Sequence, residues 1–219
     1  MRFFIFLEYL QIFFDLLREV WYNILITYGM VGIMRILGID PGLATIGWGV
    51  LDYSRNRFTP VAYGSICTKA GLPVEERLNQ IYESLSHIIE KYAPETVSIE
   101  ELFWNTNITT GIVVAEARGT ILLCAHRHGL PIYEYTPMQV KQAVVGYGKA
   151  EKKQVISMVT MLLGLKEPPK PDDTADAIAI AICHAHSGAS ALRGYYNRPT
   201  AIGGIKETPT PKPDNDRNK

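Results

Sequence analysis

The chain has 219 residues, which favours one folded domain with flanking segments, since an average domain has about 150. Its contents of hydrophobic residues (47%) and charged residues (20%) exclude a disordered, collagen-like or low-complexity protein. Lys and Arg together number 22, and so do Asp and Glu, so no overall field attracts nucleic acid or an anionic membrane. Any site for a polyanion must therefore be a local patch.

Three cysteines, Cys67, Cys124 and Cys183, are an odd number at wide spacing. Neither a disulfide framework nor a CxxC metal knuckle has this pattern. We expect these side chains to be reduced and buried as small hydrophobic groups, in a protein of the cytoplasm.

Residues 1–33 differ in composition from the rest of the chain. Charged residues interrupt their apolar runs, so none reaches the roughly 18 apolar residues of a membrane-spanning helix. A signal peptide also fits poorly, because no small-residue cleavage site follows. An interfacial helix would bind anionic lipid weakly, since acids outnumber bases. We expect an extension outside the folded core, with Met34 as the original start and no membrane partner.

Three short runs rich in β-branched and aromatic residues, separated by turn residues, predict an antiparallel meander of consecutive strands. These runs cover residues 35–40, 47–52 and 61–68. Apolar residues at helical spacing then alternate with short strand patterns. Helices are expected over 73–92, 106–128, 137–145, 150–163 and 173–186, and strands over 96–100 and 132–135.

This order of elements predicts an α/β fold with a mixed five-stranded sheet, in which parallel strands join the three-strand meander. Helices should cover both faces of the sheet. We expect this domain to span residues 34–187. The composition after Gly188 is typical of a flexible polar tail, residues 188–219.

Two carboxylates end apolar strands. Asp40 precedes a Pro-Gly turn that directs its side chain outward at the sheet edge, and Glu100 ends the fourth predicted strand. If the first and fourth strands are parallel neighbours, as a right-handed crossover favours, these carboxylates lie side by side. Like charges repel at that distance, so a bound cation would explain them. Strand alternation selects Glu100 over Glu101.

Asp173 and Asp176 lie on one face at the start of the last predicted helix, so both can reach one ion. Alternating alanines keep this helix slim and let its first turn approach the sheet. Oxygen ligands favour magnesium or manganese over zinc. His184 lies roughly 16 Å further along the helix axis and cannot bind the same ion. The spacing does not separate Asp173 from Asp172.

Each acid taken alone has an ordinary structural explanation. An acid at a strand end is usually a solvated turn residue, and an aspartate at a helix start is usually a cap that the helix dipole favours. Only the combination of the four points to a site.

Four segments carry the most specific pattern in the chain: GIDPGLATIGWGV, SIEELFW, EYTPMQVKQAVVGYGKAEKKQV and PDDTADAIAIAICHAH. In this order and spacing they closely resemble the bacterial RuvC family of Holliday junction resolvases, from about residue 34 to about residue 186. The resemblance implies an RNase H-like fold, a homodimer and magnesium-dependent cutting of two opposed strands of a four-way DNA junction. It also implies ligatable nicks as products and the RuvA–RuvB branch-migration complex as a partner.

Mapped onto this chain, the four acidic ligands of the family fall on Asp40, Glu100, Asp173 and Asp176, which selects Asp173 over Asp172. Four carboxylates suit two Mg²⁺ ions about 4 Å apart, with Mn²⁺ as a substitute. Such ions lower the pKa of the attacking water and neutralise charge on the leaving oxygen. We expect Asp40 to bridge both ions, with the other three acids completing the ligand shells.

The local basic patch lies between residues 138 and 153, where four lysines oppose one glutamate. The resemblance places Lys141 and Lys152 on basic residues that the family uses near the cut phosphate. Phe103 takes the position of an aromatic residue that stacks on a junction base, a role that Trp104 could share. A solvated helical face and core packing are the ordinary explanations for the lysines and the aromatics.

Two other functions have partial support. A sugar kinase or actin-like ATPase also begins with an Asp-Gly turn after an apolar strand, but it needs a second glycine-rich phosphate loop, which this sequence lacks. A non-catalytic junction-binding protein on the same fold would have at least one of the four acids replaced, and all four are present. The predicted helix from residue 106 has enough apolar surface for a dimer interface as well as the core.

Overall fold

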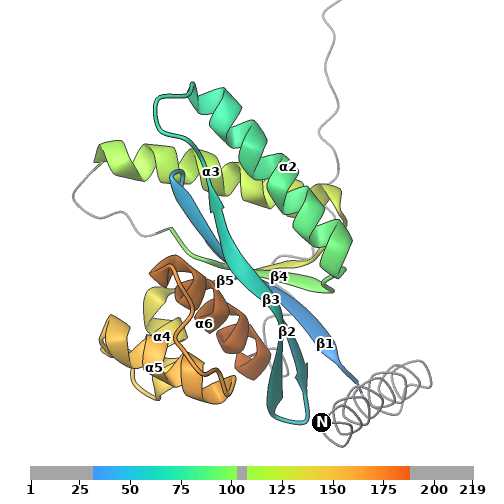
Figure 1. Ribbon diagram of the computed structural model, residues 1–219, viewed down its shortest axis with the longest axis vertical. Helices are drawn as coiled ribbons and strands as arrows, with labels where there is room; N and C mark the ends of the chain where they lie inside the picture. Colours follow the sequence, from blue (N-terminus) through green and yellow to red (C-terminus); the bar gives the residue numbers. More distant parts are fainter. Residues whose placement is uncertain (1–31, 103–107, 188–219) are drawn as a thin grey trace, which may run out of the picture.

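The computed structural model describes residues 32–102 and 108–187, which form one mixed sheet between two layers of helices (Figure 1). The predicted extension and tail, apart from Gly32 and Ile33, lie outside the described residues. The strands are β1 (Met34–Asp40), β2 (Thr45–Ser54), β3 (Arg57–Cys67), β4 (Thr96–Glu100) and β5 (Ile132–Tyr135). The helices are α2 (Val74–Tyr92), α3 (Ile108–Arg127), α4 (Pro137–Val145), α5 (Lys152–Leu162) and α6 (Asp172–Ser187).

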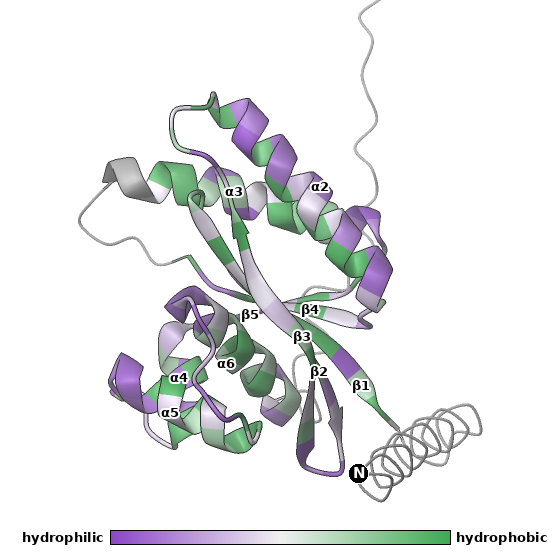
Figure 2. Cartoon of the chain, in the orientation of Figure 1, coloured by the Kyte–Doolittle hydropathy of each residue, from purple (hydrophilic) through white to green (hydrophobic). Residues whose placement is uncertain are grey.

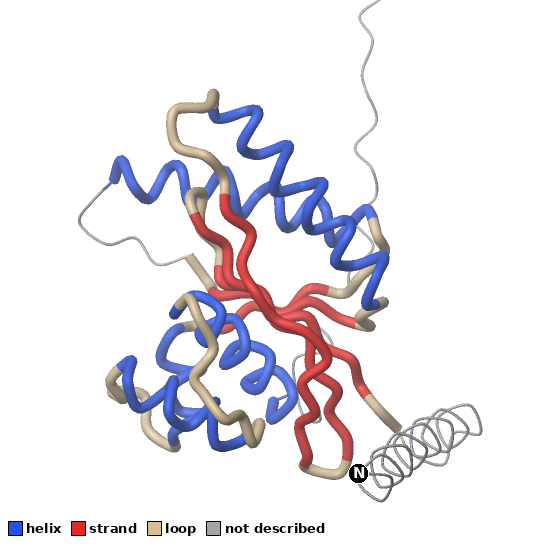
Figure 3. The backbone as a smooth tube through the Cα atoms, in the orientation of Figure 1, coloured by secondary structure: helices blue, strands red, loops and turns tan. Residues whose placement is uncertain are grey.

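The sheet has the strand order β3-β2-β1-β4-β5, drawn in red in Figure 3. The first three strands pair antiparallel, whereas β4 is parallel to β1 and β5 is parallel to β4. The predicted mixed five-stranded sheet with a three-strand meander is therefore confirmed. The predicted bounds of the second and third strands are wrong, because Arg55 and Asn56 adopt positive φ and close a tight hairpin without glycine. The two strands consequently extend to Ser54 and back to Arg57.

Each face of the sheet carries its own hydrophobic core. Strand alternation sends Ile36 of β1 to the face covered by α4, α5 and α6, and Leu37 and Ile39 to the face covered by α2 and α3. Figure 2 shows α6 as hydrophobic along most of its length, while α2 alternates hydrophobic and hydrophilic residues. This difference follows from position, because α6 is enclosed between the sheet and two other helices, whereas one side of α2 faces solvent.

Glycines on β1 and β2 let α6 lie directly against the sheet. A Cβ atom on Gly38 would overlap the carbonyl oxygen of Ala177, and one on Gly47 would overlap the carbonyl oxygen of Asp173. The alanines of α6 and these glycines thus allow a close approach that larger side chains would prevent. Because Gly47 pairs with Asp40, the same contact brings the first turn of α6 to the end of β1.

Candidate active site

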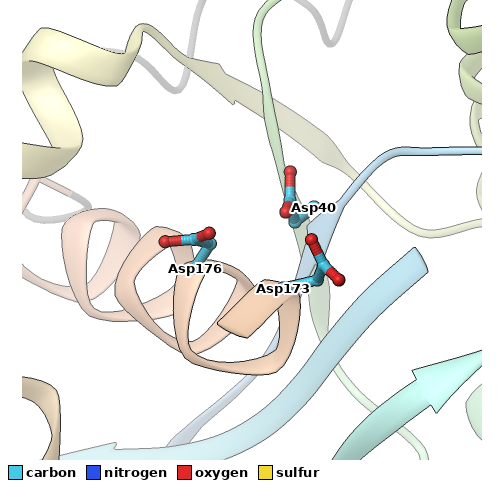
Figure 4. A group of neighbouring side chains, drawn as sticks. All are labelled: Asp40, Asp173 and Asp176. Atoms are coloured by element: carbon cyan, nitrogen blue, oxygen red, sulfur yellow. The ribbon is translucent and has the colours of Figure 1, made fainter. Parts of the chain in front are cut away.

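Three aspartates converge where β1 ends and α6 begins (Figure 4). Asp40 is the last residue of β1, while Asp173 and Asp176 come from the start of α6. Each of the three offers a carboxylate oxygen, and these oxygens lie within 4.8 Å of one another. The predicted approach of the α6 acids to Asp40 is therefore present in the structure, and Asp173 rather than Asp172 belongs to this group.

Glu100 occupies the neighbouring strand end. Ile39 pairs with Ile99 in parallel strands, so the next residues, Asp40 and Glu100, lie side by side at the same edge of the sheet. The crossover argument predicted this arrangement. The carboxylate of Glu100 is outside the three-aspartate group. It lines an adjacent hollow of about 190 Å³ together with Asp176, and its charge acts on Asp40.

The carboxylates perturb one another. Burial, followed by the charges of Glu100, Asp176 and Asp173, raises the pKa of Asp40 to about 8. Burial also raises the pKa of Glu100 and that of Asp176. Full ionisation of the cluster at neutral pH is therefore unfavourable unless a cation offsets the negative charge. A donor set made only of carboxylate oxygens fits a hard divalent cation such as Mg²⁺ or Mn²⁺.

Both predicted lysines lie beside the acids. The Nζ atom of Lys152 is 2.9 Å from Asp176 Oδ2 and 3.7 Å from Asp172 Oδ2. The hydrogen bond to Asp176 raises the pKa of Lys152, so this side chain stays cationic. Lys141 lines the hollow with Glu100 and lowers the pKa of that carboxylate against the larger effect of burial. The Lys152 side chain is 50% exposed and can therefore also reach a ligand.

The other predicted residues divide into two groups. Phe103 and Trp104 lie outside the described residues. His184 is buried at the far end of α6, where its Nδ1 atom lies 2.7 Å from the hydroxyl of Tyr135, and burial lowers its pKa to about 4. Among the described residues it takes no part in the acidic group, as its distance along the helix predicted.

Sequence reasoning missed the role of Gly47. This residue supports the site without touching a ligand, because its missing side chain makes room for the backbone of Asp173. The signal was present, since Gly47 and Gly49 interrupt the apolar run of residues 46–51, and glycine within a strand often marks a close backbone approach.

Comparisons with known proteins agree with this geometry. The family model described as crossover junction endodeoxyribonuclease RuvC matches residues 36–184. A relative of that name from Caldanaerobacter subterraneus subsp. tengcongensis is 56% identical over 165 residues, covering 75% of this chain and 100% of its own length. Another from Brevibacillus brevis is 59% identical over 152 residues, covering 69% and 92%.

Solved structures show the same similarity. The structure of Thermus thermophilus RuvC in complex with Holliday junction substrate has 37% identity and a TM-score of 0.68, covering 71% of this chain and 94% of that one. A yeast mitochondrial Holliday junction resolvase, at 13% identity and a TM-score of 0.52, shares the fold. The expected RNase H-like fold is thereby confirmed. With its family match spanning most of the described domain, the chain belongs to the RuvC family of crossover junction endodeoxyribonucleases.

Proposed function

We propose that this protein resolves four-way DNA junctions during recombination and repair, by metal-dependent hydrolysis of two opposed strands that leaves ligatable nicks. The convergence of Asp40, Asp173 and Asp176 beside Lys152 carries the proposal. Family membership and the junction bound by the Thermus relative support the choice of substrate. A kinase-like ATPase has no comparable support from the site.

The metal site we propose consists of Asp40, Glu100, Asp173 and Asp176. Two Mg²⁺ ions, or Mn²⁺ in their place, would lower the pKa of the attacking water and neutralise charge on the leaving oxygen. The carboxylate-only donor set and the raised pKa of Asp40 support this assignment.

In this proposal Lys141 and Lys152 bind the scissile phosphate of the DNA. A phosphodiester is negatively charged and would be repelled by the four carboxylates. Lys152, held at 2.9 Å from Asp176, places a positive charge beside the acids, and Lys141 lies across the same hollow. Both ammonium groups can donate hydrogen bonds to the non-bridging oxygens of the scissile phosphate, where negative charge increases in the transition state. Phe103 is proposed to stack on a junction base near the cut.

Cutting two opposed strands requires two active sites, so we propose a homodimer. Helix α3 supports this, because Ile112 and Leu123 are 50% and 54% exposed and stand eleven residues apart, on one face of the helix. Exposed apolar residues on one helix face are typical of an interface.

The RuvA–RuvB branch-migration complex is the further partner that we propose. Among the described residues no helix is long and apolar enough to span a membrane.

The test uses the purified full chain with a synthetic four-way junction, a linear duplex and a single strand, with and without Mg²⁺. We expect the junction alone to be cut, and only with the metal. Asp40→Asn and Asp173→Asn should bind the junction without cutting it, whereas Asp172→Asn, beside the site but outside the acidic group, should retain cutting. Efficient cutting by Asp40→Asn would disprove the metal assignment. Titration calorimetry with ATP tests the ATPase alternative, because that function requires nucleotide binding and the proposed nuclease does not.

A further inference from the structure

The loop between α4 and α5 joins the two helices that carry Lys141 and Lys152. Lys152 is the first residue of α5, so the position of its Nζ atom depends on where that helix begins. Its side chain is 50% exposed, and its position therefore does not follow from burial. The contacts that hold the first turn of α5 thus determine how well Lys152 is placed against Asp176.

Gln154 organises this first turn. Its Oε1 atom accepts a hydrogen bond from the backbone N–H of Glu151, at 2.8 Å, which closes the capping box of α5. The same oxygen accepts a second hydrogen bond from the hydroxyl of Tyr147, at 2.6 Å. Tyr147 therefore orients Gln154, whose capping box with Glu151 encloses Lys152 in the sequence.

Tyr147 is not a core residue. It is 45% exposed, so burial does not hold its ring in place. Its loop is defined on both sides, since Gly146 ends α4 in a left-handed conformation with φ 96° and Gly148 packs closely against Met138. Between these two fixed points the hydroxyl of Tyr147 is directed at Gln154.

We propose that Tyr147 is a positioning residue that holds Lys152 against Asp176 by way of Gln154 and the N-terminus of α5. This inference rests on the proposed function, because Lys152 matters only where a phosphate is cut. The hydroxyl matters here and the ring does not. Removing the hydroxyl leaves the fold intact and lets the first turn of α5 fluctuate, which misplaces the ammonium group during the chemical step.

The variant Tyr147→Phe removes only the hydroxyl. Under single-turnover conditions with Mg²⁺, we expect its rate of junction cleavage to fall about three- to tenfold, the range expected for one hydrogen bond expressed in the transition state. The dissociation constant for the junction and the urea midpoint of unfolding should stay at wild-type values. Tyr53→Phe is the matched control, because Tyr53 donates a bond of 2.8 Å to Asn56 in the distant β2–β3 hairpin. Its cleavage rate should equal that of the wild type.

A double-mutant cycle tests the route through Lys152. In a Lys152→Ala background, the additional Tyr147→Phe substitution should leave the rate unchanged, since no ammonium group remains to be positioned. Three results would each overturn the proposal. Tyr147→Phe could lower the cleavage rate equally in both backgrounds, could cut at the wild-type rate by itself, or could lose affinity for the junction in parallel with its rate. If the wild type itself fails to cut the junction, the proposed function fails instead, which keeps the two failures distinct.

Discussion

Replacing Asp40 with asparagine should stabilise the metal-free protein while abolishing its activity. In the folded state the pKa of Asp40 rises from 3.8 to about 8, so the ionised form is disfavoured on folding. At pH 7.5 the unfolded chain has lost a proton that the folded chain retains. The contribution of Asp40 to the stability of the wild type therefore falls as the pH rises from about 4 towards 8. Asparagine has a similar shape and carries no charge at any of these pH values.

The size of the effect follows from the shift. At 1.36 kcal/mol per pKa unit, the interval from 3.8 to pH 7.5 corresponds to about 5 kcal/mol. Relaxation of the neighbouring acids and partial solvent screening reduce this value, so we expect Asp40→Asn to raise the free energy of unfolding by about 2–3 kcal/mol. For a domain of this size the gain corresponds to an increase in Tm of about 4–10 °C.

Urea and thermal unfolding in EDTA at pH 5 and pH 7.5 measure this difference. The gain should be larger at pH 7.5 than at pH 5, and Mg²⁺ should stabilise the wild type more than Asp40→Asn. Asp172→Asn is the control, since its side chain is 64% exposed and lies outside the three-aspartate group. A destabilised Asp40→Asn protein, or a gain that does not depend on pH, would refute the electrostatic reasoning.

Three further predictions concern stability and assembly. Because burial lowers the pKa of His184 to about 4, we expect the contribution of this residue to the free energy of unfolding to fall by about 3 kcal/mol as the pH drops from 6.5 to 4, opposite in sign to the contribution of Asp40. Urea titrations should therefore show the difference in stability between His184→Phe and the wild type shifting by that amount, in favour of the variant, over this interval. Gly47→Ala should destabilise the fold by more than about 2 kcal/mol in urea and weaken Mg²⁺-dependent cutting, since the new methyl group meets the Asp173 carbonyl. Gly32→Ala, which adds a methyl group before β1 where no atom lies within 4 Å, should be neutral, and an equal loss in both variants would contradict the packing argument. Leu123→Glu should shift a dimer towards monomer in sedimentation equilibrium, and an unchanged dimer would exclude this face of α3 as the interface.

Most elements of the fold were predictable because their patterns are local. The run from residue 74 to 92 shows its apolar helical face in the sequence, and β4 shows its strand in five residues. The hairpin between β2 and β3 was not predicted to its full length, because Arg55 and Asn56 are not the glycine-containing pair that marks such turns. Turn conformation there depends on the pairing of the strands on both sides.

The candidate site divides in the same way. That Asp40 and Glu100 should meet followed from the order of strands and the handedness of the crossover, and the parallel pairing of β1 with β4 confirms the reasoning. The choice between Asp172 and Asp173 could not be made from spacing. It depends on how α6 is rotated against the sheet, which puts the Asp173 backbone against Gly47 and the Asp173 carboxylate in the acidic group.

By itself the sequence determined the class of fold, the order of its elements, the acids available for a metal site and the family resemblance. Only the tertiary structure decided which oxygens come within 4.8 Å of one another, how far the pKa of Asp40 rises, and that Lys152 is held against Asp176. The reason is physical. Secondary structure depends on residues a few positions apart, whereas the electrostatics of a site depend on distances between side chains that the sheet register and the packing of α6 bring together from distant parts of the chain.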